Sequence, residues 1–132
     1  MGLDMNAYKV HPKYLVDPDA QIDLEFKDIE EGSIIEIAYW REFNQLHGWM
    51  ERLYRQKGGI EEFNCRRVRL MPADLLQLAL DAEEGLPSVV GFFFDNGEWT
   101  EEDKEEEEVL EFCVLANQAI TDGYVVFYYS WW

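Results

Sequence analysis

Apolar side chains recur at helical spacing from Tyr39 onward, and this pattern constrains the fold more than any other feature of the chain. The positions i, i+4, i+7, i+11 and i+14 are occupied by Tyr39, Phe43, Leu46, Met50 and Leu53. Such a stripe is typical of a helix that packs one face against a core. We therefore predict a helix that begins near Ser33 or Ile35, reaches Gln56 and stops at the Gly58–Gly59 pair.

A second stripe beside the apolar one is unusually polar and aromatic for a surface helix. Taking about 100° per residue, five side chains fall within roughly 80° on the helical wheel: Glu36, Trp40, Asn44, His47 and Glu51. These groups either contact a ligand or partner, or form a buried polar seam, and we favour structural hydrogen bonding for His47. The sequence contains no HExxH, CxxC or HxxxH spacing, so we predict no metal site and no cofactor.

Three segments have the composition of strands. Residues 3–8 alternate apolar and polar side chains, residues 65–70 form a short second candidate, and residues 124–132 are dense in aromatic and β-branched side chains. The acidic loop 12–33 also contains an alternating stretch, for which we predict a short edge strand: Ile22, Leu24 and Phe26.

Two further helices complete the predicted order β-α-β-α-α-β. Pro72 is a favourable first residue for the second helix, which should end at Gly85. Thr100 with Asp103 resembles a capping box for the third helix, which should end at Gly123. We predict an α+β fold, in which a small antiparallel sheet of the N-terminal strand, the strand near 65–70 and the C-terminal strand is packed by about three helices. Residues 1–132 then form a single acidic domain.

This topology predicts which side chains are buried. The side chains expected to face the helices are Leu3, Met5, Ala7, Val68 and Leu70, and those expected to face outward are Asp4, Asn6, Tyr8, Arg67 and Arg69. One core is expected to contain Tyr39, Phe43, Leu46, Met50, Leu110 or Phe112, Ala116, and Val126 or Phe127.

The formal charge of −17 is distributed unevenly along the chain. Residues 41–69 hold seven of the eleven basic residues and four of the 28 acidic ones, so this segment carries +3 and the rest −20. The imbalance argues against direct binding of nucleic acid phosphates by the whole surface. It permits a small basic patch, or an acidic surface that docks on a basic partner protein.

The most acidic stretch lies near the predicted start of the third helix. It contains Glu101, Glu102, Asp103, Glu105, Glu106 and Glu108. A solvated helix face near a helix N-terminus explains such a run most simply, because the helix dipole favours acids there. The alternative is a surface for a basic partner, or one that mimics a phosphate backbone.

The sequence also limits the environment of the protein. No apolar run approaches the ~20 residues that span a bilayer, and the N-terminus lacks the pattern of a signal peptide. Cys65 and Cys113 lie far apart in the sequence, so we expect two reduced, partly buried thiols. Together these features predict a cytoplasmic protein without a membrane partner.

Several motifs together resemble a family of small proteins encoded by phages and prophages. That family opens with MGLDM and an early tyrosine, and continues with a segment like YWRKANxIHxWF, an Asn-Cys pair, GFFF and an end like WxFYYxSSW. The matching residues here are Met1–Met5, Tyr8, Tyr39, Trp40, Arg41, Asn44, His47, Trp49, Asn64, Cys65, Gly91–Phe94 and Phe127–Trp131. The segment 95–99 and the acidic stretch after Lys104 depart from the family pattern. The resemblance implies a phage protein in a host cell and no particular reaction.

Two function classes follow. The first is a non-enzymatic phage accessory protein that binds or modulates a host protein through an acidic surface. The second is a small-ligand-binding protein or enzyme with a pocket formed by Trp40, Arg41, Asn44, His47 and Phe92–Phe94. We favour the first class, because the sequence has no GxSxG, Walker or GxGxxG motif. The two classes differ in the expected surroundings of His47, which are open for a ligand site and filled for a structural seam.

Overall fold

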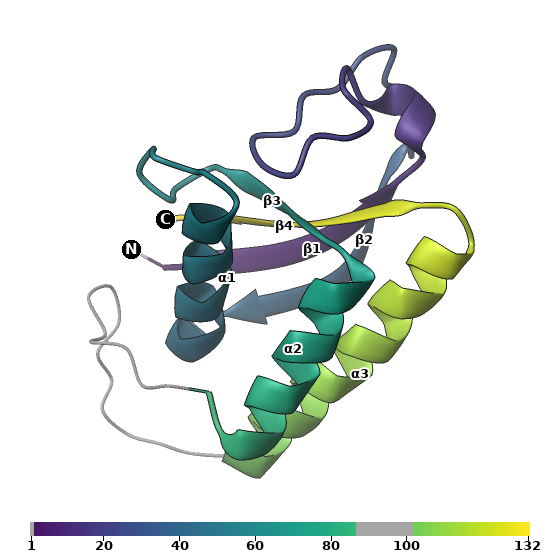
Figure 1. The fold of residues 1–132 in the computed structure, drawn as a ribbon. Coiled ribbons are helices and arrows are strands. Elements are labelled where there is room, and N and C mark those ends of the chain that lie inside the picture. The colour runs from purple at the N-terminus through teal and green to yellow at the C-terminus, as the bar shows by residue number, and fades with distance from the viewer. Residues whose placement is uncertain (1, 87–101) are drawn as a thin grey trace.

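Four antiparallel strands form one sheet with three helices on one of its faces (Figure 1). The computed structural model describes residues 2–86 and 102–132, with the side chains of 102–104 left out. The elements are β1 (Asp4–Val10), a 3-10 turn (Pro12–Tyr14), β2 (Ile34–Arg41), α1 (Asn44–Gln56), β3 (Arg67–Leu70), α2 (Pro72–Glu84), α3 (Glu102–Thr121) and β4 (Val125–Trp131). The strand order is β2-β1-β4-β3. This confirms the predicted α+β fold and adds a fourth strand.

The added strand comes from the first half of the predicted long helix, so that prediction was wrong. β2 pairs with β1 along its length, and α1 begins only at Asn44. The run Ile34–Trp40 is rich in β-branched and aromatic residues, which fit a pleated sheet, and Glu42 has a left-handed φ of 56° that ends the strand. Tyr39 matched the helical spacing by coincidence. Its side chain is 52% exposed and lies outside the core.

The helix-facing side of the sheet holds the main core. The five side chains predicted there are all buried: Leu3, Met5, Ala7, Val68 and Leu70. Most of the predicted core partners from the helices and from β4 lie in the same cluster, namely Phe43, Leu46, Met50, Leu53, Phe112, Ala116 and Val126. Phe127 points to the opposite face and belongs to a second cluster.

The loop between β1 and β2 covers part of the other face of the sheet. Leu15 and Leu24 pack there against Val10 and Phe127, and Ile22 makes an isolated bridge to Val68 at the outer edge of β3. The predicted edge strand is therefore reduced to single bridges.

Two residues of β1 that were predicted to face outward are less exposed than expected. Asn6 is buried, and Tyr8 is half-buried against Phe127, with ring centroids 5.4 Å apart.

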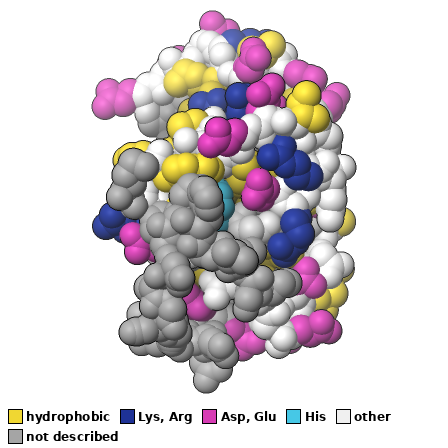
Figure 2. Space-filling model, turned by 90° about the vertical axis from the view of Figure 1, so that its left-hand side faces the viewer, with side chains coloured by type: hydrophobic (Ala, Val, Ile, Leu, Met, Phe, Trp, Pro, Cys, Tyr) yellow, Lys and Arg dark blue, Asp and Glu magenta, His cyan; other side chains and the backbone are white. Residues whose placement is uncertain are grey.

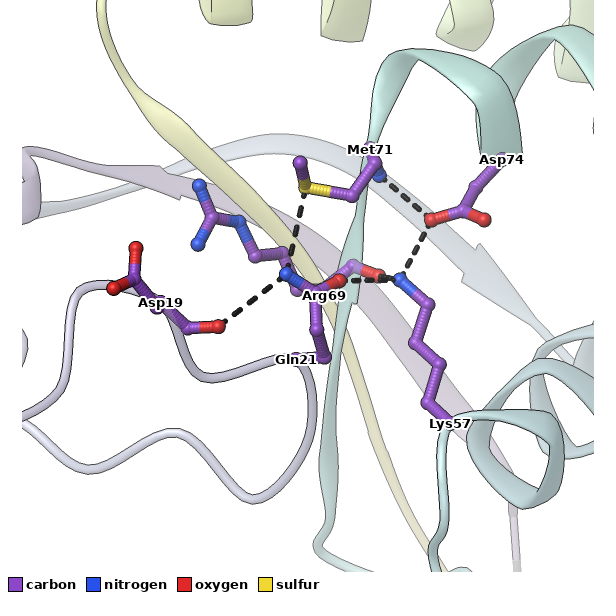
Figure 3. Close-up of polar contacts among 6 residues, drawn as sticks. All are labelled: Asp19, Gln21, Lys57, Arg69, Met71 and Asp74. Carbon is purple, nitrogen blue, oxygen red and sulfur yellow. Dashed lines mark hydrogen bonds and ion pairs between the residues drawn. The ribbon is translucent and has the colours of Figure 1, made fainter.

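A lysine joins the end of α1 to the start of α2 (Figure 3). Lys57 Nζ donates to Gln21 Oε1 at 2.8 Å, to the Arg69 carbonyl at 2.7 Å and to Asp74 Oδ2 at 2.6 Å. The same Asp74 oxygen accepts from the Met71 backbone N–H at 2.8 Å, which satisfies one of the free donors at the start of α2. We refer to Gln21, Lys57, Arg69 and Asp74 as the lysine clamp.

The predicted limits of the second helix and the predicted C-terminal end of the third are confirmed. α2 begins at Pro72 and is followed by Gly85, while α3 is followed by Gly123, and both glycines adopt the positive φ that favours glycine. The proposed cap at Thr100 lies outside the described residues. Both cysteines are free thiols, but Cys65 is exposed and only Cys113 is buried, which corrects the expectation of two partly buried thiols.

Candidate functional site

The polar stripe predicted from the sequence does not form one face, because a strand and a helix divide its residues. Trp40 and Arg41 belong to β2. The Trp40 indole is buried and meets the Phe112 ring edge-on, with centroids 5.1 Å apart, while Arg41 is exposed with Nε 3.8 Å from Asp4 Oδ1. Glu36 also lies on β2 and accepts a hydrogen bond from the Asn6 amide.

The other three stripe residues lie on α1 in different surroundings. Glu51 pairs with Arg55 on the surface at 3.3 Å, and Asn44 lies at the first position of the helix. His47 is only 6% exposed. Trp40, Arg41, Glu36 and Glu51 therefore each have a partner of their own, and the stripe does not converge on a single site in the described part of the chain.

His47 sits in a buried cluster in which two polar side chains of β4 approach its ring. Its Nδ1 atom lies 2.8 Å from the Tyr128 hydroxyl and 3.4 Å from Ser130 Oγ. The rings of Phe63 and Trp132 pack on it, with centroids 5.1 Å and 5.4 Å away. Sequence reasoning missed these partners. The available signal was the alternation in the last strand, which places Tyr128 and Ser130 on the same face.

The electrostatics of this cluster indicate a neutral imidazole. Burial lowers the pKa of His47 to about 4 and raises the pKa of Tyr128 above its ordinary value, and the Ser130 hydroxyl opposes part of the second shift. We assign the Tyr128 O–H as donor to Nδ1, which leaves the ring proton on Nε2. Ser130 is 1% exposed, so this cluster has the character of a buried hydrogen-bonded seam.

The hollows among the described residues are small or shallow. A cavity of about 150 Å³ lies between α1 and α2, where the Trp49 indole N–H and the Gln77 amide both donate to Asp81, at 2.8 Å and 2.9 Å. A second, of about 140 Å³, is lined by Phe43, Gln45, Ala82, Gly85, Leu86, Glu105 and Glu106. Both are smaller than the ~300 Å³ at which ligand pockets usually begin. A wider hollow on α1 is open and lined only by Gly48 and charged or amide side chains.

The basic segment 41–69 is used mainly to hold the protein together. Arg69 donates to the Pro18 carbonyl at 2.7 Å, Arg67 to the Leu24 carbonyl at 3.0 Å, and Arg66 pairs with Asp23 and Glu61. Among these seven cations, Arg52 has no recorded hydrogen bond or ion pair with the described residues. On the face that carries α1 and the chain ends, positive and negative side chains are interspersed (Figure 2), so no uniform basic patch is seen there.

The predicted acidic surface is spread over different environments on α3. Glu105 and Glu106 line the cavity next to Phe43, and Glu108 is half-buried. Glu101 and the side chains of Glu102 and Asp103 lie outside what the structure describes. Among the described acids of this region, those with exposed side chains are Glu107 and Glu111, which were not among the residues predicted for the acidic surface.

These two acids share a helix face with an exposed valine, and α2 presents a matching face. Glu107, Glu111 and Val114 follow i, i+4, i+7 spacing on α3, and Leu76, Leu80 and Glu83 do so on α2. The two helices lie side by side (Figure 1). They touch where Cys113 Sγ lies 3.6 Å from the Leu75 carbonyl, so their outward neighbours Val114 and Leu76 flank the seam. Val114 is 70% exposed and Leu76 63%. We call these six residues the α2–α3 surface.

No protein-family model, curated protein or solved structure matches the chain. Within the described ranges, no group of three or more His, Cys, Asp or Glu side chains is arranged to hold a metal ion. No described helix is long and apolar enough to cross a membrane.

Proposed function

We propose that this chain is a non-enzymatic interaction protein that binds a basic region of a partner protein through the α2–α3 surface. The observation that carries the proposal is the exposure of three large apolar side chains among carboxylates: Leu76, Leu80 and Val114. Single exposed apolar residues are ordinary, but a group across two adjoining helices, rimmed by charge, is typical of an interaction surface.

The charge of the surface indicates the chemistry of the partner. Glu83, Glu107 and Glu111 are exposed; Glu83 lies one helical turn from Leu80, Glu111 one turn from Val114, and Glu107 one turn beyond Glu111. A partner segment with apolar side chains flanked by Lys or Arg would satisfy both features. Nucleic acid is a poor candidate because its phosphates would be repelled, and the net charge of −17 strengthens that repulsion at long range.

The resemblance to small phage and prophage proteins supports a host protein as the partner and the host cytoplasm as the place of binding. A small-ligand pocket around Trp40, Asn44, His47 and Phe92–Phe94 has weaker support. Trp40 and His47 are both packed in the core, and Phe92–Phe94 lie outside the described residues.

Affinity capture from a bacterial lysate with three forms of the protein tests the proposal. The forms are the wild type, the double variant Leu76→Gln/Val114→Gln and the control Ile60→Gln. Ile60 is 87% exposed on the loop between α1 and β3, so it matches the test residues in exposure but not in place. A protein captured by the wild type is then purified and titrated.

We expect the double variant to bind at least ~10-fold more weakly, because two apolar side chains leave the interface. The control should keep its affinity, and binding should weaken as salt rises. Equal affinity for all three forms, or a loss with Ile60→Gln alone, would exclude the α2–α3 surface as the binding site.

A further inference from the structure

The outer edge of β2 is a second surface without a partner strand among the described residues. β2 is the last strand of the sheet on its side, whereas the opposite edge, β3, is covered by the loop that bridges Ile22 to Val68. The main-chain groups along the outer side of β2 have no recorded partner among residues 2–86 and 102–132. An open strand edge is a template for another extended chain.

The register identifies which main-chain groups of β2 face away from β1. The Glu42 N–H donates to the Leu3 carbonyl at 2.9 Å, and Arg41 lies opposite Asp4. Because hydrogen-bonded and non-hydrogen-bonded pairs alternate in an antiparallel ladder, Trp40 bonds to β1 while the N–H and C=O groups of Tyr39 and Arg41 point away from it. A β-bulge near Ile37 interrupts the pairing on the N-terminal side of Tyr39. The outward groups of Tyr39 and Arg41 therefore form one short ladder with a fixed register.

Side chains beside this ladder are suited to an apolar strand with basic residues. On the helix side, Phe112 packs on Trp40, and Leu115 and Glu108, three and four residues away on α3, lie on the same side of the helix. Leu115 is 54% exposed, and Ile35 on β2 is exposed as well. On the opposite side of the sheet, β2 presents the exposed Glu36 carboxylate and the Tyr39 ring.

We propose that β2 accepts an extended segment of a partner protein, in which apolar and Lys or Arg side chains alternate, as an added antiparallel strand. The apolar positions of that segment lie against Leu115 and Ile35, and its basic positions lie near Glu36. Main-chain bonds to Tyr39 and Arg41 supply affinity, and the alternation supplies specificity, as in other cases of strand addition. The α2–α3 surface is not involved, so either proposal can fail without the other.

The test uses the full chain and a synthetic probe, acetyl-Lys-Val-Lys-Val-Lys-Val-Lys-amide. A peptide with the same composition in blocks, four Lys and then three Val, controls for charge. Amide hydrogen exchange of the wild type requires no substitution. We expect the alternating peptide to slow exchange at the Tyr39 and Arg41 amides and the block peptide to leave it unchanged. Equal effects of the two peptides, no effect of either, or protection confined to α2 and α3 would overturn the proposal.

A pair of variants then isolates the main-chain contact. Tyr39→Pro removes the outward N–H without removing a bond to β1, and proline is tolerated at such edge positions. Tyr39→Thr removes the same phenol and keeps the N–H, so it is the matched control. We expect the proline variant to bind the alternating peptide at least ~5-fold more weakly than the threonine variant. Equal affinities would refute strand addition. Protection of the same amides that grows with protein concentration, without peptide, would assign the edge to a second copy of this chain and refute the partner strand.

Discussion

At the scale of single residues, His47 shows that the role of a polar side chain depends on where the fold places it. A histidine between an asparagine and a glutamate on a helix suggests acid–base chemistry or ligand binding, yet the Nδ1 atom of His47 faces the buried Tyr128 and Ser130 hydroxyls. Buried hydroxyl and imidazole groups satisfy one another here, and each would lose free energy if left alone in the core.

We therefore predict that His47→Ala destabilises the protein by about 1–3 kcal/mol at pH 7, since the change strands two buried hydroxyl groups. Gln45→Ala, two residues away on the same helix and half-buried, is the control and should change the free energy of unfolding by less than ~1 kcal/mol. Urea denaturation measures both. A fully stable His47→Ala protein would show that the ring is held there for binding and not for the fold.

The depressed pKa of His47 also predicts a pH response. Between the ordinary pKa of 6.5 and the folded pKa of about 4, the unfolded chain binds a proton that the folded protein does not. Stability from this residue is present above pH 6.5 and is lost as the pH falls toward 4. Carboxylates also titrate in part of this range, so the measured quantity is the difference between wild type and His47→Ala. That difference should shrink as the pH is lowered, and a constant difference would contradict the assignment of a neutral imidazole.

At the scale of elements, the sequence predicted three strands and the two later helices because each had its own boundary signals. Pro72, Gly85 and Gly123 mark helix ends through backbone geometry, which does not depend on distant contacts. β2 was missed because Tyr39 continued the helical spacing of α1 by chance, and pairing with β1 decided its conformation. The partners of His47 could not be predicted from the sequence either, because they depend on how β4 lies against α1.

The lysine clamp is the contact that ties several elements at once, and it gives a test at this scale. Lys57 and Asp74 are both largely shielded from water, whereas the Arg55–Glu51 pair on the same helix is exposed. We predict that Lys57→Met costs about 1–3 kcal/mol, because it removes three hydrogen bonds. Glu51→Gln, which breaks the exposed pair and leaves the Arg55 hydrogen bond to the Gly59 carbonyl in place, should cost less than ~1 kcal/mol. Chemical denaturation compares them, and equal losses would mean that the clamp adds nothing beyond a surface ion pair.

At the scale of the whole molecule, basic side chains mostly make internal contacts, whereas acidic side chains mostly face the solvent. Six of the seven cations in residues 41–69 make internal hydrogen bonds or ion pairs, while much of the acidic excess remains on exposed surfaces. The folded state therefore carries a net repulsion that the extended chain relieves.

This distribution predicts that moderate salt raises the melting temperature, because screening weakens repulsion between exposed carboxylates more than it weakens the shielded clamp. Thermal unfolding at rising sodium chloride concentration measures the effect at pH 7. Sodium chloride and an uncharged osmolyte at equal osmolality separate screening from general solute effects. A melting temperature that falls steadily with salt would show that ion pairs of the 41–69 segment outweigh the repulsion.

The position of β4 has a consequence for the order in which the protein assembles. This strand is the last element of the chain, yet it lies between β1 and β3 in the sheet. Until it inserts, β1 pairs with one strand, β3 pairs with no strand, and His47 lacks both hydroxyl partners. Joining β1 to β4 closes a loop of more than a hundred residues, so we expect folding to be slow for a chain of this size, with one late cooperative step. A chain shortened before Val125 would present two further open strand edges, one on β1 and one on β3, and would tend to aggregate rather than fold.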